Sequence, residues 1–340
     1  MDNSLVTVSI ASYNNAHYIG RCIDSVIRQS YSNLEILIID DGSSDKTVEV
    51  LKLYENEPRI KVINKKNEGL SSVRQLALDT AGGKYICFID ADDYLSESYI
   101  EVMLNRIVQT DSDICVCGTR FEDENGNYLS SFSKMFECHD SRDPYKPSYF
   151  EINQYGNQNV GRLHISDSWN KLYHLGFLRS CQVKFGMPKG LNGTDELFNR
   201  LLLIHRPNYI TVSQELYVHV MYEYSAVHRK SKNLIASFAL ILDSMIKECE
   251  KLHVLNELKE FLSIYYITSI YAAHLDVLGD KENDFSSIRC EDENLQERHE
   301  FLKKPEYNGI PINISLFFFL YKSCPSLVPL LFKIRDAICS

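Results

Sequence analysis

Apolar residues over the first 120 positions follow two periods, one typical of buried strands and one typical of helices. Four short runs are almost entirely apolar, and we predict them to be strands: 6–11, 34–39, 60–63 and 85–89. Three segments between and after them carry apolar residues at helical spacing, and we predict them to be helices: 16–30, 45–56 and 70–81. This alternation predicts an α/β fold, in which a Rossmann-like, mostly parallel sheet is flanked by helices on both faces.

Polar residues gather directly after three of these strands. Tyr13 lies in a turn-prone stretch after the first strand, and Asp40 and Asp41 end the second. The sequence Asp90-Ala91-Asp92-Asp93 ends the strand at 85–89. Because ligands of such sheets bind beyond the carboxyl ends of the strands, we expect these turns to form one site.

The acidic turn at 90–93 has two interpretations. Carboxylates crowded on a tight turn repel one another, and hard oxygen ligands of this kind suit Mg²⁺ or Mn²⁺, which keep open positions for substrate phosphates. Aspartate is also common as a helix cap, so a purely structural turn is the alternative. The turn at Asp40-Asp41 has the same two interpretations, because a carboxylate there could cap a helix or accept a hydrogen bond from a nucleobase.

The second half of the chain is organised differently. Residues 122–162 are polar and turn-rich, which predicts an excursion or loop. Residues 233–278 contain long stretches without Gly or Pro, which predicts helices. Residues 280–300 are charged, which predicts a solvated loop or helix face. We therefore expect two domains: a catalytic domain at 1–230 and a helical C-terminal extension at 231–340.

An apolar segment at 311–338 closes the chain. A membrane-spanning helix needs about 20 consecutive apolar residues, and Lys322, Pro325 and Pro329 interrupt this segment. We expect no span. Three alternatives stay open: packing against the helical extension, peripheral contact with a membrane surface, or an oligomer contact.

The composition of the chain bears on its binding partners and on its cellular compartment. The chain has 340 residues and a formal net charge of -10, which argues against nucleic acid because phosphate binding favours basic surfaces. Its ten cysteines show no CxxC pair and no zinc spacing, so we expect a reducing compartment. The N-terminal residues lack a basic start followed by an apolar run, so we expect no signal peptide and a cytoplasmic location.

Several motifs occur in an order that closely resembles the family-2 glycosyltransferases of GT-A fold, over roughly residues 5 to 230. They run from the first strand to the segment after Leu216 and Tyr217: VSIASYN at 8–14, DDGSSD at 40–45, NEGLSSVR at 67–74, FIDADD at 88–93, WNKLY at 169–173 and GTDELFN at 193–199. Each is moderately specific, and their number and order make the resemblance strong.

The resemblance implies a role for each matching position. Tyr13 and Asp41 match residues that hold uracil, and Arg74 matches the basic residue near the donor phosphates. Asp90 and Asp92 are the acids of the D-x-D motif and would hold the metal. Two further residues have implied roles: Asp93 would touch ribose or metal, and Asp195 would act as the general base.

A single base suits transfer with inversion. One carboxylate takes the proton of the acceptor hydroxyl as its oxygen attacks the anomeric carbon from the face opposite the leaving group. In inverting hydrolysis a second carboxyl protonates the leaving group, a task that a metal cofactor, Mn²⁺ or Mg²⁺, would take over here.

The chain departs from the family pattern at two points. Thr194 stands where relatives have Glu before the base, and Val220 stands where they often have Arg. His219 or His228 is a candidate for the phosphate contact that the Arg would make, although either is equally consistent with a packing or surface residue.

The expected function is therefore that of an inverting, metal-dependent glycosyltransferase. It would move a sugar from a UDP-sugar donor to a glycan or lipid-linked glycan acceptor in surface polysaccharide biosynthesis, at the inner face of the plasma membrane and in a possible homo-oligomer. A catalytically silent, glycosyltransferase-like nucleotide-binding or scaffolding subunit is the alternative. A dinucleotide-dependent oxidoreductase lacks support, because no G-x-G-x-x-G follows the first strand.

Overall fold

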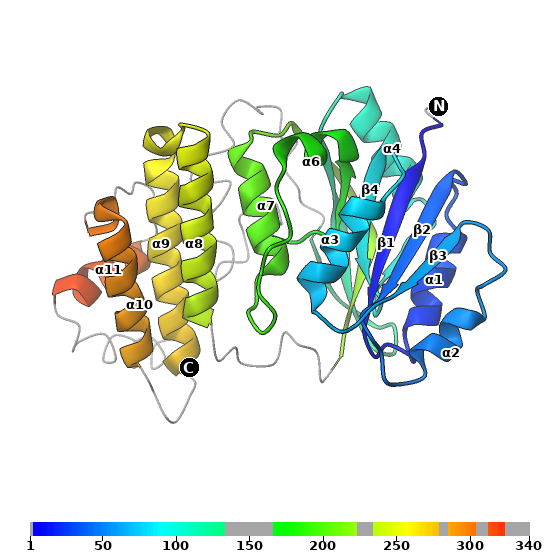
Figure 1. Ribbon diagram of the computed structural model, residues 1–340, viewed down its shortest axis with the longest axis horizontal. Helices are drawn as coiled ribbons and strands as arrows, with labels where there is room; N and C mark the ends of the chain where they lie inside the picture. Colours follow the sequence, from blue (N-terminus) through cyan, green and yellow to red (C-terminus); the bar gives the residue numbers. More distant parts are fainter. Residues whose placement is uncertain (1–2, 133–165, 223–233, 279–284, 304–311, 324–340) are drawn as a thin grey trace. The chain divides into compact units, whose positions relative to one another are not determined.

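The computed structural model describes residues 3–132, 166–222, 234–278, 285–303 and 312–323. The chain divides into two compact units. The first contains residues 1–142, 161–190 and 194–229, and the second contains residues 143–160, 191–193 and 230–340. Figure 1 shows the sheet and helices of the first unit and the helices of the second.

The first unit holds all the described strands and six labelled helices. The four strands at its start have bounds within one residue of those predicted. Its strands are β1 (Val6–Ser12), β2 (Leu34–Asp40), β3 (Ile60–Asn64), β4 (Tyr85–Asp90), β5 (Tyr94–Leu95), β6 (Ile114–Asp123), β7 (Tyr128–Phe132), β8 (Lys171–His174) and β9 (Tyr209–Met221). Its helices are α1 (Ile19–Ile27), α2 (Thr47–Lys52), α3 (Leu70–Thr80), α4 (Tyr99–Gln109), α6 (Leu175–Cys181) and α7 (Thr194–Ile204).

These strands form one sheet in the order β3-β2-β1-β4-β8-β6-β9-β5, with β7 paired to β6. The strands from β3 to β4 are parallel, as predicted, and β6 is parallel to β9. Strand β8 enters antiparallel between β4 and β6. The predicted α/β class, with a mostly parallel sheet and flanking helices, is confirmed, and β8 joins its two parallel parts.

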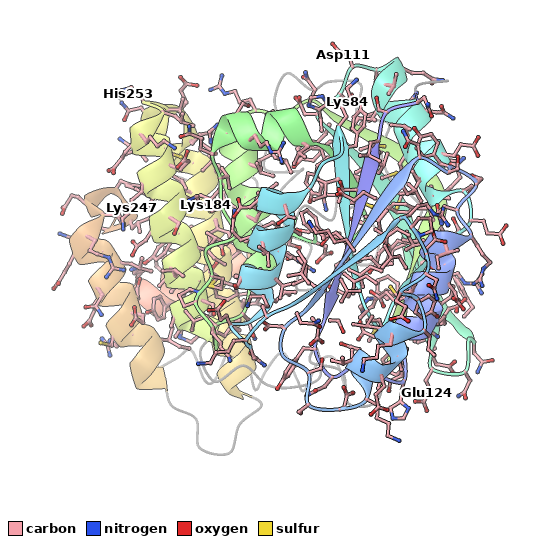
Figure 2. All side chains as sticks on the ribbon, turned by 45° about the vertical axis from the view of Figure 1, so that its right-hand side comes forward. Lys84, Asp111, Glu124, Lys184, Lys247 and His253 are labelled. Atoms are coloured by element: carbon pink, nitrogen blue, oxygen red, sulfur yellow. The ribbon has the colours of Figure 1, made fainter. Side chains whose placement is uncertain are left out.

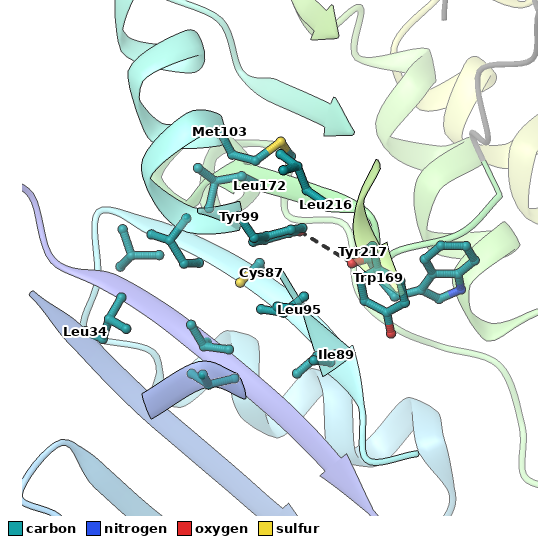
Figure 3. Packing of buried hydrophobic residues seen from close by; sticks show 14 of the residues in the cluster. Leu34, Cys87, Ile89, Leu95, Tyr99, Met103, Trp169, Leu172, Leu216 and Tyr217 are labelled. Carbon is teal, nitrogen blue, oxygen red and sulfur yellow. Dashed lines mark hydrogen bonds between the residues drawn. The ribbon is translucent and has the colours of Figure 1, made fainter. Parts of the chain in front are cut away.

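Alternate strand residues build a core on each face of the sheet. On one face, residues of β1, β2, β4 and β6 pack with the apolar stripes of α1 and α4. Cys115 and Cys117 point into this core two positions apart on β6. Figure 3 shows Tyr99 of α4 in this cluster, near Trp169 and Tyr217. On the other face, Phe88 contacts Phe185, which stacks on Phe198 of α7 at 3.8 Å.

The second unit is helical, as the sequence predicts for residues after 233. Its helices are α8 (Leu234–Lys251), α9 (Leu255–Leu278), α10 (Phe285–Arg298), the 3-10 helix η2 (Glu300–Lys303) and α11 (Ile312–Ser323). The segment at 280–300 thus contains a helix, and it is partly buried because Ile288, Asp292 and Leu295 face the unit's interior.

Helix α11 packs within the second unit, which bears on the apolar segment at 311–338. Phe317, Phe318 and Tyr321 are buried, whereas Phe319 is 60% exposed. The hydroxyl of Tyr321 donates to Asp292 at 2.9 Å, and Lys322 pairs with the same carboxylate at 3.2 Å. Residues 324–338 of the segment lie outside the described residues. None of the described helices combines the length and apolarity needed to cross a bilayer.

The predicted excursion at 122–162 begins as regular structure. Strand β6 continues to Asp123, and β7 returns antiparallel to it from Tyr128. The side chain of Asp123 accepts hydrogen bonds from the backbone of Asn125 and Asn127, and Gly126 takes a φ of 82°. The polar residues that suggest a loop are therefore the turn of a hairpin. Residues 133–162 lie outside the described residues.

Two adjacent glycines after α3 do different jobs. Helix α3 ends at Thr80 and its C-cap Ala81 is not left-handed, so neither Gly82 nor Gly83 serves as a left-handed helix cap. A Cβ on Gly83 would lie 2.7 Å from the backbone nitrogen of Thr7 and 2.7 Å from the carbonyl oxygen of Tyr85. A Cβ on Gly82 would meet only the flexible carboxylate of Glu35, at 3.5 Å. Gly83 is therefore required by a close backbone approach where β1 and β4 begin.

We expect Gly83→Ala to lower the free energy of unfolding by about 1–3 kcal/mol, because two backbone segments must move to admit the methyl group. Gly82→Ala is the matched control and should change it by no more than about 0.5 kcal/mol. Urea denaturation followed by the fluorescence of Trp169, the only tryptophan, measures both variants. Equal stabilities for the two variants would contradict the close approach.

Candidate active site

The residues predicted to do chemistry lie at one end of the sheet. Figure 2 shows Lys84, which precedes β4, and Glu124, which follows β6, at opposite ends of the first unit. Tyr13, Asp41 and the turn at 90–93 follow the carboxyl ends of β1, β2 and β4, so they share the end marked by Glu124. This is the edge at which ligands of such sheets bind.

Asp41 is buried and ties the loop after β3 to the end of β2. Its carboxylate accepts from the Nζ of Lys65 at 2.8 Å and from the backbone N–H groups of Glu68 and Gly69, at 3.0 and 2.7 Å. Asp40 is also buried and accepts from the backbone and side chain of Ser43. Both aspartates therefore shape the loops of the site, and Asp41 carries the more strongly bound carboxylate.

Tyr13 stands out as a large apolar side chain that is 49% exposed. The next residue, Asn14, holds its loop against the loop after β2: its Oδ1 accepts from the N–H of Ser44 at 2.8 Å, and its own N–H donates to Ser43 at 2.8 Å. Asn14 has a φ of 55°, the left-handed conformation that asparagine tolerates best after glycine. The ring of Tyr13 is thus presented from a fixed turn.

Arg74 joins two of the predicted acids. Only 1% of this residue is exposed, and its Nη2 donates to Asp90 at 2.8 Å while its Nη1 pairs with Asp195. The three residues come from α3, the end of β4 and the first turn of α7. A buried guanidinium needs such partners, because an unpaired charge away from water is costly. Arg74 therefore brings the D-x-D motif and the predicted base into one cluster.

Asp195 is held by a second set of contacts. Its Oδ2 accepts from the backbone N–H of Ser168 at 3.1 Å. Asn199, fully buried one turn further along α7, donates from Nδ2 to the carbonyl of Asp195 at 3.0 Å and to the hydroxyl of Ser168 at 3.0 Å. Its Oδ1 accepts from Tyr173 at 2.8 Å. The segment before β8 and the start of α7 therefore fix the position of this carboxylate together.

A buried lysine supports the same segment. Lys171 is fully buried, and its Nζ donates to the carbonyl of Asp167 and to the Oδ1 of Asn170. Burial lowers the pKa of Lys171 to about 8, although the nearby Asp167 acts in the opposite direction. These contacts fix the backbone turn between residues 167 and 171, which includes the Ser168 N–H that donates to Asp195.

Asp93 is the most enclosed acid of the site. It is fully buried and accepts from the hydroxyl of Tyr217 at 2.6 Å and from the backbone N–H of Val220 at 2.9 Å, and its Oδ2 lies 2.9 Å from Nδ1 of His219. Burial raises the pKa of Asp93, and the partnership with His219 opposes that rise. These contacts make Asp93 an anchor between the acidic turn and β9.

The pKa of His219 is raised as a result. Burial alone would lower its pKa, but the hydrogen bond to Asp93 and the charges of Asp93, Asp90 and Asp92 raise it to about 9. Trp169 stacks on the imidazole ring at 5.5 Å between ring centroids and contacts Tyr217 at 4.7 Å. His219 thus faces Asp93, and the other candidate, His228, lies outside the described residues.

Asp92 differs from its neighbours in having an open carboxylate. Apart from its own backbone N–H, no described residue donates a hydrogen bond to that carboxylate. Burial, together with the charges of Asp93 and Asp90, raises the pKa of Asp92 to about 7. A cation beside this carboxylate would relieve the repulsion within the turn.

The donor set suits a divalent ion that takes further ligands from its substrate. The described residues contain no group of three or more His, Cys, Asp or Glu side chains placed to hold a metal alone. Mg²⁺ and similar ions bind through one or two carboxylates together with phosphates and water. Asp92, with Asp90 beside it, offers that arrangement, so the residues fit the predicted ion.

Sequence reasoning missed several residues that shape the site. Lys65 follows β3 at the same edge as Asp41 follows β2, which was a usable signal. The sequence offered Tyr217 within a motif and His219 as a candidate phosphate contact, but their contacts with Asp93 were missed. The two residues alternate on β9 and so share one face of that strand. No local pattern marks Ser168, whose contribution is a backbone N–H. At the departure from the family pattern, the hydroxyl of Thr194 contacts that of Ser71 at 3.1 Å.

The chain is similar to known proteins over different extents. Residues 7–171 match the family described as Glycosyl transferase family 2. The glycosyltransferase GlyA of Streptococcus pneumoniae is 32% identical over 63% of this chain, and the chondroitin synthase of Pasteurella multocida is 41% identical over 34% of it. The chain spans only 30% of the length of GlyA and 12% of that of the synthase.

The fold is also similar to that of a solved structure. The crystal structure of S. aureus TarS 1-349 in complex with UDP-GlcNAc aligns with a TM-score of 0.56 and 18% identity, covering 90% of this chain and 94% of that one. At this identity the likeness concerns the fold. Residues 7–171 therefore form a glycosyl transferase family 2 region, and the fold that contains them is of GT-A type.

Proposed function

We propose that this chain is an inverting, metal-dependent glycosyltransferase that moves a sugar from a UDP-sugar to a glycan or lipid-linked glycan acceptor. The observation that carries the proposal is the Arg74 cluster, which joins Asp90 of the acidic turn to Asp195. A transferase of this type needs its leaving-group site and its base on opposite sides of one sugar. Two acids from distant segments, joined by one buried side chain, supply groups for both tasks.

The donor nucleotide would lie over the ends of β1 and β2. Tyr13 offers an exposed ring, and aromatic faces are good platforms for bases. Asp41 follows the neighbouring strand, and its carboxylate accepts three hydrogen bonds. A carboxylate can accept about four, so one place is left for a uracil N–H. The UDP-GlcNAc in the similar TarS structure is in keeping with a uridine donor.

Asp92 and Asp90 would hold Mn²⁺ or Mg²⁺. When bound, such an ion neutralises the charge that builds up on the diphosphate as it leaves. The protein's own part is to hold the two carboxylates in place. Arg74 does so for Asp90, and the contacts of Asp93 with Tyr217 and His219 fix the residue directly after Asp92.

Asp195 would take the proton from the acceptor hydroxyl. The hydroxyl oxygen forms a bond to the anomeric carbon, the bond from that carbon to the diphosphate oxygen breaks, and the proton passes to the Asp195 carboxylate. Arg74 pairs with this carboxylate before the step, and the N–H of Ser168 directs its Oδ2. Since Arg74 is committed to both acids, we assign it to positioning, in addition to any approach to the phosphates.

The proposed acceptor and cellular location rest on a similar protein and on helix α11. The similarity to a chondroitin synthase is in keeping with a polysaccharide product, and we propose surface polysaccharide biosynthesis at the inner face of the plasma membrane. The exposed Phe319 on α11 is the described residue best suited to a peripheral membrane contact. Association with a second copy through the same helical extension is part of the same proposal.

A donor screen tests the proposal as a whole. The purified chain is incubated with UDP-, GDP- and dTDP-sugars, with Mn²⁺, with Mg²⁺ and with chelator, and free nucleotide is measured. Release of UDP that requires the metal is the expected result. Binding of UDP without turnover of any sugar, also in the presence of glycan acceptors, would favour the silent, nucleotide-binding subunit.

We expect Asp92→Ala to abolish the metal-dependent part of UDP binding, because its carboxylate is the one left open by the surrounding residues. Calorimetric titration of UDP with and without Mn²⁺ measures this. Glu124→Gln, at the exposed turn after β6, is the matched control and should behave as the unchanged protein does. An Asp92→Ala variant in which Mn²⁺ still tightens UDP binding would contradict the assignment.

Replacing Asp195 by Asn should reduce transfer by about 10²–10⁴-fold, the usual contribution of a general base, while UDP binds almost as before. The variant should also unfold at a lower temperature, because buried Arg74 loses a charged partner. Glu196→Gln is the control, since Glu196 pairs with Arg200 on the same helix. Turnover at the unchanged rate in Asp195→Asn would make another residue the base.

A further inference from the structure

We propose that Arg21 is a positioning residue for Asp92: it fixes the backbone of the acidic turn so that the Asp92 carboxylate faces the metal and donor. The inference rests on the proposed metal site at Asp90 and Asp92. It adds a role for a side chain on α1, a helix for which neither the motifs nor the site described so far require any function beyond packing.

One face of α1 is hydrogen-bonded along the segment that starts with the acidic turn. The thiol of Cys22 donates to the carbonyl of Asp90 at 3.6 Å, and the hydroxyl of Ser25 accepts from the N–H of Leu95 at 3.1 Å. Just beyond the end of α1, Nε2 of Gln29 donates to the carbonyl of Ser96 at 2.7 Å. These side chains recur at helical spacing, so α1 and the residues directly after it fix the backbone of residues 90–96.

Arg21 adds the only charged member of this set within the described part of the chain. Its Nη2 donates to the carbonyl of Asp92 at 2.7 Å and to the hydroxyl of Tyr222 at 2.8 Å. The Tyr222 hydroxyl donates to the same carbonyl at 3.2 Å. The guanidinium carbon lies 4.9 Å from the ring centroid of Tyr94, two residues after Asp92. Arg21 thus closes a triangle of α1, the acidic turn and the end of β9.

These contacts hold the backbone of Asp92, the acid of the turn whose carboxylate no other side chain orients among the described residues. Asp93 is held by three groups and Asp90 by Arg74, whereas Asp92 receives no side-chain hydrogen bond among the described residues. Its side-chain direction therefore depends on its backbone, and its carbonyl is held by Arg21 and Tyr222. Residues that orient a metal ligand without touching the metal commonly change affinity by 10–100-fold when they are replaced.

A planar guanidinium is required for this arrangement. One Nη group reaches two oxygens while the flat face lies over Tyr94, a combination that a lysine ammonium does not reproduce at this length. We therefore expect Arg21→Lys to restore only part of what Arg21→Met removes. Tyr222→Phe should have a smaller effect of the same sign, because it removes one of the two donors to the Asp92 carbonyl.

The test is a Mn²⁺ titration followed by the electron paramagnetic resonance signal of the free ion, in the presence of saturating UDP. Arg21→Met should raise the Kd for Mn²⁺ by about 10-fold or more, and Arg28→Met should leave it unchanged. Arg28 is the C-cap of the same helix, and its side chain pairs with the exposed Asp24, at 3.9 Å. Activity of Arg21→Met should return toward that of the unchanged protein at high Mn²⁺ concentration.

The outcomes separate this inference from the proposed function. If the unchanged protein binds no Mn²⁺ with UDP, the metal site itself falls and the inference with it. If the unchanged protein binds Mn²⁺ and a folded Arg21→Met binds it equally well, only the role of Arg21 is overturned. A loss of thermal stability with an unchanged Kd likewise means a structural role alone. Should Arg21→Met fail to fold, an unchanged Kd in Tyr222→Phe overturns the inference.

Discussion

A single buried cation holds the proposed active site together. Arg74 can be placed in the interior only if carboxylates meet it there, because an unpaired charge away from water costs several kcal/mol (roughly). Its partners, Asp90 and Asp195, are 105 residues apart in the chain and come from different elements. The ends of α3, β4 and α7 must therefore converge for the fold to be stable. The same requirement brings the proposed metal turn and the proposed base to one place.

The rest of the site balances negative charge in the same way. Asp41 is matched by Lys65 and two backbone N–H groups, and Asp93 is matched by His219, Tyr217 and a backbone N–H. Each match comes from a different element, so each carboxylate also joins two parts of the chain. Asp92 is the exception, because its carboxylate lacks such a match among the described residues. An ion supplied from outside would complete the balance at that position.

Local patterns were sufficient for the first half of the fold and insufficient for contacts made between distant segments. The strands from β1 to β4 were predicted within a residue or two, because buried parallel strands form short, continuous apolar runs. The insertion of β8 between β4 and β6 was not predicted, since four residues carry no periodic signal. The resemblance singled out Arg74, but its burial between two acids depends on where α7 begins. The contacts of Asp93 with β9 could not be predicted either, because Tyr217 and His219 lie more than 120 residues further along the chain.

The departure at Thr194 has a physical meaning in this arrangement. The family pattern places a second acid directly before the base, and this chain instead has a hydroxyl that contacts Ser71 on α3, three residues before Arg74. A carboxylate at that position would add a negative charge to a helix turn that already contains Asp195 and Glu196, whereas the described cations near it are Arg74 and Arg200, each already paired. The hydroxyl keeps α7 joined to α3 without further charge. The neutral residue therefore leaves the buried Arg74 with Asp90 and Asp195 as its two acidic partners and adds no third carboxylate beside them.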